Sequence, residues 1–435
     1  MKIINEGTKF SFTLGLVLLF TVGCLLAYQP SAVAQDSYKI GTVLPLTGNY
    51  GSIGSAMQKS DILAMKHINE SGGIMGHELK LANRDTASTP TSGVDAARKL
   101  IQVDGVPAYV GAFSSGVSKA IAEGVTIPNK VVQIAQGSTS PMLSILTDDD
   151  YFFRACMHDL YQGAAVAEEI YEDGVRKLGI MYVNNPYGLG LNDSSALRFE
   201  DLGGEVIEQV PYEQAKATYA AEVDRVFSGD VDGVLFITYP EDMMTISKNA
   251  IAKGYSPQER PWYGVDAWKA PEVIEAVGGE NLEGIKGTSQ GVLGGPSYET
   301  FRSSYQEEFN ELPPKPFMEP GYDAVVSIAL AIAKSGKAPG EVTSTDIRDN
   351  LRPVTSEPGE KVYAGPEELE KAFDLLAEGE EINYIGAAGE VAYDEYGDAA
   401  SAVQIWQIKD GEFTTFDNVI PEPVARERLG EEYQQ

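Results

Sequence analysis

The residues from Tyr109 to Leu143 read YVGAFSSGVSKAIAEGVTIPNKVVQIAQGSTSPML and contain one pattern twice. An apolar run at 107–110 leads through a glycine to Ser114 and Ser115, where a helical pattern begins. A second apolar run at 131–134 leads into another loop rich in hydroxyl side chains. A strand, a hydroxyl-bearing loop and a helix, repeated in this order, predict neighbouring parallel strands of an α/β sheet.

The second loop contains Gly137, Ser138 and Thr139, and Pro141 begins the next turn. Both loops would place hydroxyl groups and free backbone N–H groups at the carboxyl ends of parallel strands. Helix N-termini carry partial positive charge, and ligands bind at this edge of open α/β sheets. The stretch therefore predicts a site for a small anion such as a carboxylate.

The chain has 435 residues, which is too long for one hydrophobic core, so two lobes are expected. Apolar strand patterns alternate with helical patterns from residue 38 to residue 110 and again from residue 177 to residue 266. This alternation predicts a parallel sheet with right-handed crossovers in each lobe.

The first 34 residues have the pattern of an export signal. The apolar stretch 12–27 follows two lysines, and Ala32-Val33-Ala34 is a small-x-small cleavage site. Residues 1–34 are therefore predicted to be a signal peptide, which implies a periplasmic or extracytoplasmic protein. A membrane anchor and lipid attachment at Cys24 are the alternatives.

The formal net charge is −31, with 64 acidic and 33 basic residues. A nucleic-acid partner is not expected, because a phosphate backbone requires a basic surface. The acidity is typical of a solvated surface suited to a salty environment.

No metal, cofactor or catalytic group is expected. Cys156 would be the only cysteine after signal cleavage, and its apolar neighbours predict a buried thiol. The three histidines lack metal-ligand spacing, and GxSxG, HExxH and CxxC motifs are absent. The Gly-rich segment 48–54 is the one feature that favours an α/β enzyme, but its spacing is GxxGxxG rather than the dinucleotide-binding GxGxxG.

The order and spacing of several short segments resemble a known family, over residues 38 to 413. These segments are LPLTG (44–48), INESGGIMG (68–76), VGAFSS (110–115), STSP (138–141), FR (153–154), YGLG (187–190), GG (203–204), YPE (239–241), GVD (264–266), GEVAYD (389–394) and GD (397–398). The chain resembles the periplasmic solute-binding proteins of ABC importers, of the type I, leucine-binding-protein-like kind that binds branched-chain amino acids or amides.

The resemblance implies a two-lobed α/β fold in which each lobe is a mostly parallel sheet flanked by helices. Three hinge crossovers would lie near Arg154, Ser289 and Ala402, and closure of the hinge would hold the ligand between the lobes. Arg154 is expected to form a salt bridge in the hinge region. The implied division is residues 37–155 plus 291–400 for lobe I, 156–290 plus 401–420 for lobe II, and 421–435 for a polar tail.

The resemblance also implies the ligand contacts of lobe I. The hydroxyl and N–H groups of Ser114 would hold the ligand carboxylate, with Ser115 beside it. In the second loop, Thr139 would add to the carboxylate, the Gly137 carbonyl would accept from the ligand ammonium, and Ser138 lies between them.

Four further ligand contacts follow from the same resemblance. Tyr187 and Tyr239 of lobe II would close over the ligand, and Asp266 would pair with the ammonium. Asp266 stands where the family frequently has Glu, and Ile53 stands where an aromatic wall is common. Gln136 replaces a usual Pro and is expected to face the pocket.

The implied function is that of a non-catalytic component of an ABC importer, which captures an amino acid and delivers it to a membrane permease. A sensory module for an amide or aromatic acid is the main alternative. Structural alternatives also exist for single residues: Ser114 and Ser115 as helix N-caps, Tyr187 and Tyr239 as packing aromatics, and Asp266 as an N-cap.

Overall fold

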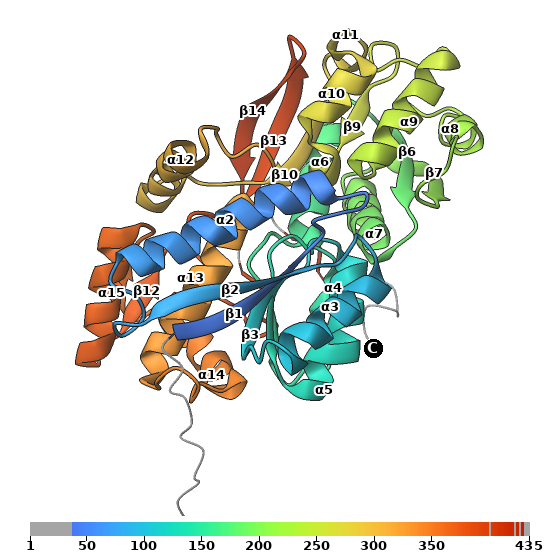
Figure 1. Cartoon of the computed structure of the whole chain (residues 1–435). Coiled ribbons are helices and arrows are strands. Elements are labelled where there is room, and N and C mark those ends of the chain that lie inside the picture. Colours follow the sequence, from blue (N-terminus) through green and yellow to red (C-terminus); the bar gives the residue numbers. More distant parts are fainter. Residues whose placement is uncertain (1–36, 400–401, 422, 426–427, 430–435) are drawn as a thin grey trace, which may run out of the picture. The chain divides into compact units, whose positions relative to one another are not determined.

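The computed structural model describes residues 37–399, 402–421, 423–425 and 428–429, and the predicted signal peptide and Cys24 lie outside these residues. Two sheets form separate layers (Figure 1). Lobe I is defined here as the first sheet with the helices packed on it, and lobe II as the second sheet with its helices.

The sheet of lobe I has five parallel strands in the order β2-β1-β3-β4-β5. The strands are β1 (Ser37–Leu44), β2 (Glu78–Asp85), β3 (Ala108–Gly111), β4 (Val132–Ala135) and β5 (Phe152–Arg154). The helices are α2 (Gly51–Glu70), α3 (Pro90–Gln102), α4 (Ser115–Ile121), α5 (Ile127–Asn129), α12 (Pro296–Phe309), α13 (Met318–Ser335), α14 (Ser344–Thr355) and α15 (Pro366–Glu378). A small parallel pair, β11 (Glu360–Val362) and β12 (Ile382–Tyr384), accompanies α14 and α15.

Helices bury both faces of this sheet. Because strand side chains alternate, each face presents apolar side chains to a different set of helices. Ile40, Val110 and Ile134 pack with apolar side chains of α2 and α13. Val43 and Tyr109 belong to a second cluster with side chains of α3 and α4 on the other face. Helices on both faces force the sheet to bind its ligands at an edge.

The sheet of lobe II has seven strands in the order β14-β13-β10-β9-β8-β6-β7. They are β6 (Lys177–Val183), β7 (Glu205–Tyr212), β8 (Gly233–Ile237), β9 (Trp262–Gly264), β10 (Lys286–Gln290), β13 (Val403–Lys409) and β14 (Glu412–Val419). The strands from β6 to β10 pair in parallel, whereas β13 and β14 pair antiparallel at one edge. The sheet is therefore mostly parallel, as the sequence predicts.

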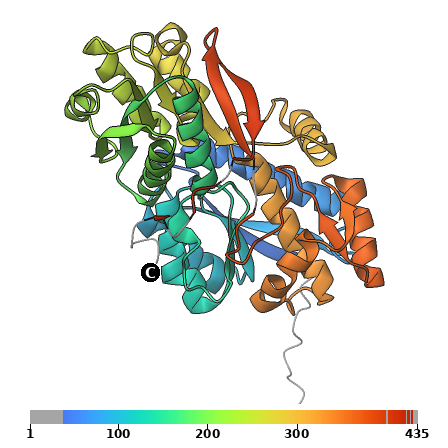
Figure 2. The same cartoon turned by 180° about the vertical axis from the view of Figure 1, so that it is seen from behind.

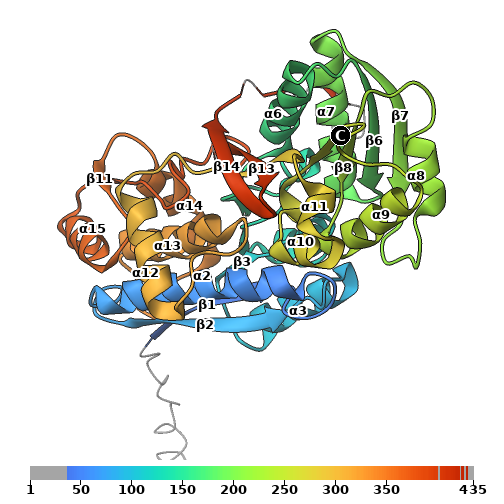
Figure 3. The ribbon, with the colours of Figure 1, turned by 90° about the horizontal axis from the view of Figure 1, so that it is seen from above.

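Helices cover both faces of this second sheet (Figure 3). They are α6 (Asp159–Glu172), α7 (Pro186–Asp201), α8 (Ala220–Val226), α9 (Pro240–Ala252), α10 (Pro271–Val277) and α11 (Gly279–Leu282), and a short 3-10 turn spans Asp266–Trp268. The interior strand β8 is buried along its whole length, as expected for a strand covered on both sides.

The chain passes between the two sheets at three places. It leaves lobe I between β5 and α6, returns between β10 and α12, and enters lobe II again before β13 (Figure 2). Gln290 lies at the second passage and accepts a hydrogen bond from the Met157 backbone N–H at 2.7 Å, beside the first. The crossing segments therefore lie against one another and form a hinge region.

A buried salt bridge ties the hinge region to the second hydroxyl loop. Arg154 donates from Nε (2.9 Å) and Nη2 (2.7 Å) to Asp398 Oδ1. Its Nη1 donates to the carbonyl oxygens of Ser140 (2.9 Å) and Ser138 (3.3 Å). The hinge salt bridge expected of Arg154 is confirmed, and the same guanidinium fixes the backbone of the loop that contains Thr139.

Candidate functional site

The hydroxyl loops of lobe I follow β3 and β4, which are adjacent in the sheet. The Ser138 hydroxyl shares a hydrogen bond with Ser118 Oγ at 2.8 Å and donates to the Phe113 carbonyl at 3.0 Å. The Ser115 hydroxyl accepts from the Ser140 N–H at 3.2 Å. These two predicted site residues therefore hold the loops together.

The Ser114 hydroxyl does not cap the helix that follows it. Ser114 is the N-cap residue of α4, but its side chain accepts no hydrogen bond from that helix. Instead Ser114 Oγ shares a hydrogen bond of 3.4 Å with the Tyr239 hydroxyl of lobe II. The side chain is thus directed across the space between the lobes.

Tyr187 and Asp266 lie together on the lobe II side. The Tyr187 hydroxyl donates to Asp266 Oδ1 at 2.8 Å, and Gln162 Nε2 donates to the same oxygen at 2.8 Å. Burial raises the pKa of Asp266 to about 6, while these two hydrogen bonds oppose the rise. The carboxylate is therefore buried and held by neutral donors only.

Tyr187 lies in the first turn of α7, which begins at Pro186. The Asn185 side chain accepts from the Gly188 N–H and caps the helix, and proline suits the first turn. A Cβ on Gly188 would lie 2.0 Å from the Val183 carbonyl oxygen, so glycine allows this turn to approach β6.

Tyr187 and Tyr239 pack against each other with ring centroids 5.5 Å apart. Together with Asp266 and lobe I residues they enclose a cavity of about 10 Å³. Its lining consists of Phe113, Ser115, Gly137, Tyr187, Tyr239, Asp266 and Ala267. This volume is close to the minimum that holds one water molecule, so the two lobes are closed on one another here.

Thr139 is buried and does not line this cavity, and it lies beside a second carboxylate. The Asp159 N–H donates to the Thr139 carbonyl at 2.9 Å. Among the described residues, neither Thr139 Oγ1 nor the Asp159 carboxylate has a well-aligned hydrogen-bond partner. Burial raises the pKa of Asp159 well above its ordinary value, and the charge of Asp266 adds to the rise, while the Thr139 hydroxyl and Arg154 oppose it.

Ile53 stands where an aromatic residue is common, and aromatic side chains from other parts of the chain cluster near it. The Tyr50 ring lies 4.4 Å from the Tyr239 ring and 5.6 Å from the Phe113 ring, measured between centroids. Phe317 lies 6.1 Å from Phe113 in the same way. Ile53 is buried in the same apolar cluster.

Tyr50 and Phe113 could have been identified from the sequence, because each lies within or beside a loop already assigned to the site. Phe317 gave no such signal, since it lies about 200 residues from Phe113 along the chain. A Cβ on Gly137 would lie 2.9 Å from the Phe113 ring, so glycine permits this close packing.

Gln136 does not face the cavity. It is buried, and its amide nitrogen lies beside Gly321 of α13 and the Asp61 carboxylate of α2. The prediction that it faces the pocket is wrong, because the bend after β4 directs its side chain toward α2 and α13.

Among the described residues, no group of His, Cys, Asp and Glu side chains could hold a metal ion. Cys156 is a buried free thiol, as expected, and burial raises its pKa. Also within the described part of the chain, no helix has the length and apolar character needed to span a bilayer.

Two α/β lobes joined by crossing segments, with Ser115 and Gly137 of one lobe and Asp266 of the other lining a closed space between them, are the arrangement of a two-lobed solute-binding protein. A family model for periplasmic binding proteins matches residues 37–409. The chemotactic signal transduction substrate-binding protein BasB of Halobacterium salinarum is 25% identical over 390 residues, which cover 88% of this chain and 89% of BasB. The Leu/Ile/Val-binding protein homolog 1 of Brucella abortus is 30% identical over 185 residues, covering 42% of this chain and 48% of that protein.

Solved structures share the fold. The leucine-binding protein LivK of Thermotoga maritima has a TM-score of 0.75 at 25% identity, covering 88% of this chain and 99% of LivK. LivJ of Streptococcus pneumoniae, in complex with isoleucine, has a TM-score of 0.71 at 21% identity. The match covers 88% of this chain and 100% of LivJ. A solute-binding protein of R. palustris in complex with benzoate has a TM-score of 0.71 at 17% identity, covering 91% and 99%.

The chain belongs to the periplasmic binding protein family, in its type I, leucine-binding-protein-like branch. It is a solute-binding protein of the branched-chain amino acid family, which is an extracytoplasmic family. Its homologues and its fold are those of binding proteins and not of enzymes, which confirms the expectation from the sequence.

Proposed function

We propose that this protein captures a free amino acid between its lobes and delivers it to the permease of an ABC importer. One observation carries the proposal: Ser115 and Gly137 of the lobe I loops line the same closed, buried space as the Asp266 carboxylate of lobe II. A zwitterion requires hydrogen-bond donors at one end and a negative charge at the other, and this space offers both.

In the proposed complex, Ser114 Oγ and Thr139 Oγ1 donate to the ligand carboxylate. The ligand ammonium donates to Asp266 and to the Gly137 carbonyl. Hydrogen bonds to charged groups contribute about 1.5–3 kcal/mol each, so four of them, less the cost of association, reach the roughly −8 kcal/mol of micromolar binding.

The ligand would enter when the lobes separate about the hinge. Opening separates Ser114 from Tyr239, and it separates the Ser140 hydroxyl from the Pro186 carbonyl, to which it donates at 2.8 Å. The ammonium would then replace the Tyr187 hydroxyl on Asp266 as the lobes close again. We propose 37–155 plus 291–400 and 156–290 plus 401–420 as the two bodies that move.

The aromatic side chains Tyr50, Phe113 and Phe317 would surround the ligand's side chain together with Ile53. This lining favours an apolar side chain, and an aliphatic amino acid is the first choice. LivJ, a structural neighbour in complex with isoleucine, supports that choice through the fold alone.

A sensory role is the second candidate, favoured by one comparison. BasB is named as part of a chemotactic signal transduction system and aligns along most of this chain. In that role the closed protein would contact a receptor instead of a permease, and the ligand site would be the same. The benzoate complex of the R. palustris neighbour makes an aromatic acid the alternative ligand.

Export by the predicted signal at 1–34 supports either role, with lipid attachment at Cys24 as the alternative processing. Intact mass measurement of the protein isolated from its membrane and soluble fractions distinguishes these outcomes. A chain beginning at Gln35 indicates cleavage after Ala34, and a lipidated Cys24 indicates an anchor.

A thermal-shift screen of aliphatic amino acids, their amides and aromatic acids tests the proposed ligand class. A ligand that binds only the folded state raises the melting midpoint. Aliphatic amino acids should give the largest rise, and a rise confined to aromatic acids would refute the amino acid assignment.

A further inference from the structure

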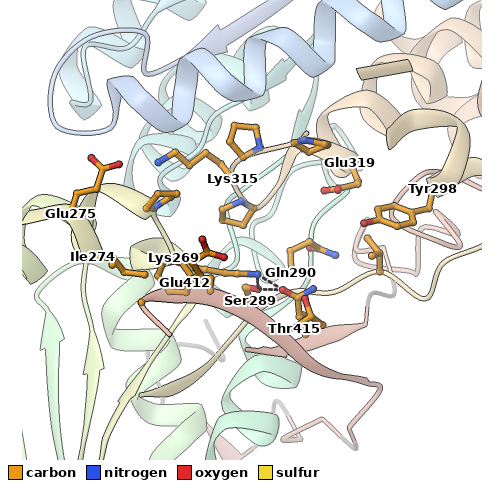
Figure 4. A pocket seen from close by; sticks show the side chains of 18 residues that line it. Lys269, Ile274, Glu275, Ser289, Gln290, Tyr298, Lys315, Glu319, Glu412 and Thr415 are labelled. Carbon is orange, nitrogen blue, oxygen red and sulfur yellow. Dashed lines mark hydrogen bonds between the residues drawn. The ribbon is translucent and has the colours of Figure 1, made fainter. Parts of the chain in front are cut away.

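A second cavity is lined by residues other than those of the site proposed above. It has a volume of about 570 Å³, within the range of roughly 300–1,000 Å³ that small-molecule sites occupy. Its walls come from lobe II (Pro271 and Ile274 of α10), from β13 and β14, and from lobe I (the segment Pro313–Pro316, and Glu319 of α13). Figure 4 shows these side chains directed toward a common space.

Strand β10 runs beside this cavity and contacts a residue that holds Asp266 of the first site. Gln162 Nε2, which holds Asp266, lies 3.2 Å from Thr288 Oγ1. The next residue, Ser289, has its hydroxyl 3.4 Å from Lys269 Nζ and lines the large cavity. No residue that lines this cavity also lines the cavity beside Asp266, so the two are distinct spaces.

Lys269 is a half-buried ammonium whose hydrogen-bond partners are neutral. Its Nζ donates to Gln404 Oε1 and to Ser289 Oγ. An ammonium has three donors, so one remains for a further acceptor. In contrast Lys315, the other lysine of the lining, forms a salt bridge with Glu272.

Glu319 and Tyr298 face Lys269 from across the cavity (Figure 4). Burial raises the pKa of Glu319 to about 7 and lowers that of Lys269 to about 8. At neutral pH the lysine therefore keeps its charge, while the carboxyl group opposite is partly protonated. Glu275 and Glu412 also belong to the lining, and they disfavour ligands with more than one negative charge.

The apolar part of the lining is rich in proline. It includes Pro271, Ile274, Val292, Pro313, Pro314, Pro316 and Phe413. Proline side chains lose little freedom when a ligand contacts them, so they form a pre-organised surface for an apolar body.

We infer that this cavity is a second ligand site, which takes a small monocarboxylate with an apolar body and pairs the carboxylate with Lys269. The ligand's carboxylate lies beside Ser289 and Gln290, and its body lies against the prolines. Since the walls belong to both lobes and to the crossing segment after β10, an occupant also favours the closed arrangement.

The test uses the mature protein and cyclohexanecarboxylate as the probe, with cyclohexanecarboxamide as its neutral isostere. Calorimetric titration should show binding of the acid and at least about tenfold weaker binding of the amide. Lys269→Met should weaken the affinity for the acid by at least about tenfold, whereas Lys269→Arg should retain binding of the acid. Ser114→Ala should leave the affinity for the acid unchanged. Melting midpoints of the variants show whether each is folded.

Two results would overturn the inference. One is the absence of any binding of the acid at millimolar concentration. The other is binding that Ser114→Ala removes and Lys269→Met does not, which assigns the probe to the first site. Failure of the proposed amino acid function is a separate outcome, because Asp266 and not Lys269 controls it.

Discussion

The Tyr187 hydroxyl donates a 2.8 Å hydrogen bond to the Asp266 carboxylate, within lobe II and beside the closed space between the lobes. The same oxygen accepts from Gln162, so Asp266 is satisfied by two neutral donors. A ligand ammonium would exchange one neutral donor for a charged one, and charged hydrogen bonds are about twice as strong. This exchange provides a reason for the lobes to close more firmly on a zwitterion.

Replacement of Tyr187 by Phe tests this exchange. The variant keeps the ring but removes a hydrogen bond that lowers the pKa of Asp266, so that pKa should rise further. Amino acid affinity at pH 8 should stay within about threefold of the wild type, and its decline with acid should begin at higher pH. A tenfold loss at every pH, measured by calorimetry, would instead assign the hydroxyl a direct ligand contact.

The pH dependence of binding follows from Asp266 itself. The carboxylate must be charged to pair with an ammonium, and burial raises its pKa to about 6 in the ligand-free protein. Binding below this pKa must release a proton, so affinity should fall as pH falls, by about tenfold between pH 7.5 and pH 5. An affinity that stays constant over this interval would show that Asp266 does not meet the ammonium.

Two serines of the hydroxyl loops should behave oppositely when changed to alanine. Ser114 makes no capping bond to α4, so Ser114→Ala should weaken ligand binding at least about tenfold while the melting midpoint changes little. Ser138 links the two loops, so Ser138→Ala should lower the free energy of unfolding by about 1–3 kcal/mol. Denaturant unfolding and calorimetry on both variants separate the roles, and equal stability losses would contradict the assignment.

The buried pair Arg154–Asp398 should be required for stability. Arg154→Met leaves the carboxylate and two loop carbonyls without their guanidinium partner, and loss of one member of a buried pair costs about 3–5 kcal/mol. The exposed pair Lys253–Asp224 is the matched control, and Lys253→Gln should cost less than about 1 kcal/mol. Similar losses for both variants in denaturant unfolding would contradict a structural role for the hinge pair.

The sequence predicted the parallel sheets of both lobes and the helices that follow their strands, because burial on both faces produces continuous apolar runs. It did not predict β14, whose residues are mostly exposed and show no regular alternation. The start of α7 at Pro186 also has no clear sequence signal, because the Asn-Pro cap before Tyr187 has the composition of a loop.

At the site, local sequence patterns predicted the two hydroxyl loops. They did not predict the direction in which each serine side chain of these loops points. Ser115 and Ser138 have the same chemistry as Ser114, yet their hydroxyls bond within lobe I. Asp159, which lies beside Thr139, follows a crossover and has no local motif. Contacts made by chain segments far apart in sequence decide these roles.

In the proposed complex, Asp266 recognises the ammonium of an amino acid held between the lobes. The most direct measurement compares leucine with 4-methylpentanoate, the same molecule without its amine, in the wild type and in Asp266→Asn. Calorimetry should show that the substitution weakens the affinity for leucine by at least about tenfold. The affinity for 4-methylpentanoate should change by less than about threefold. An equal effect on both ligands, or leucine binding that survives the substitution, would contradict the claim.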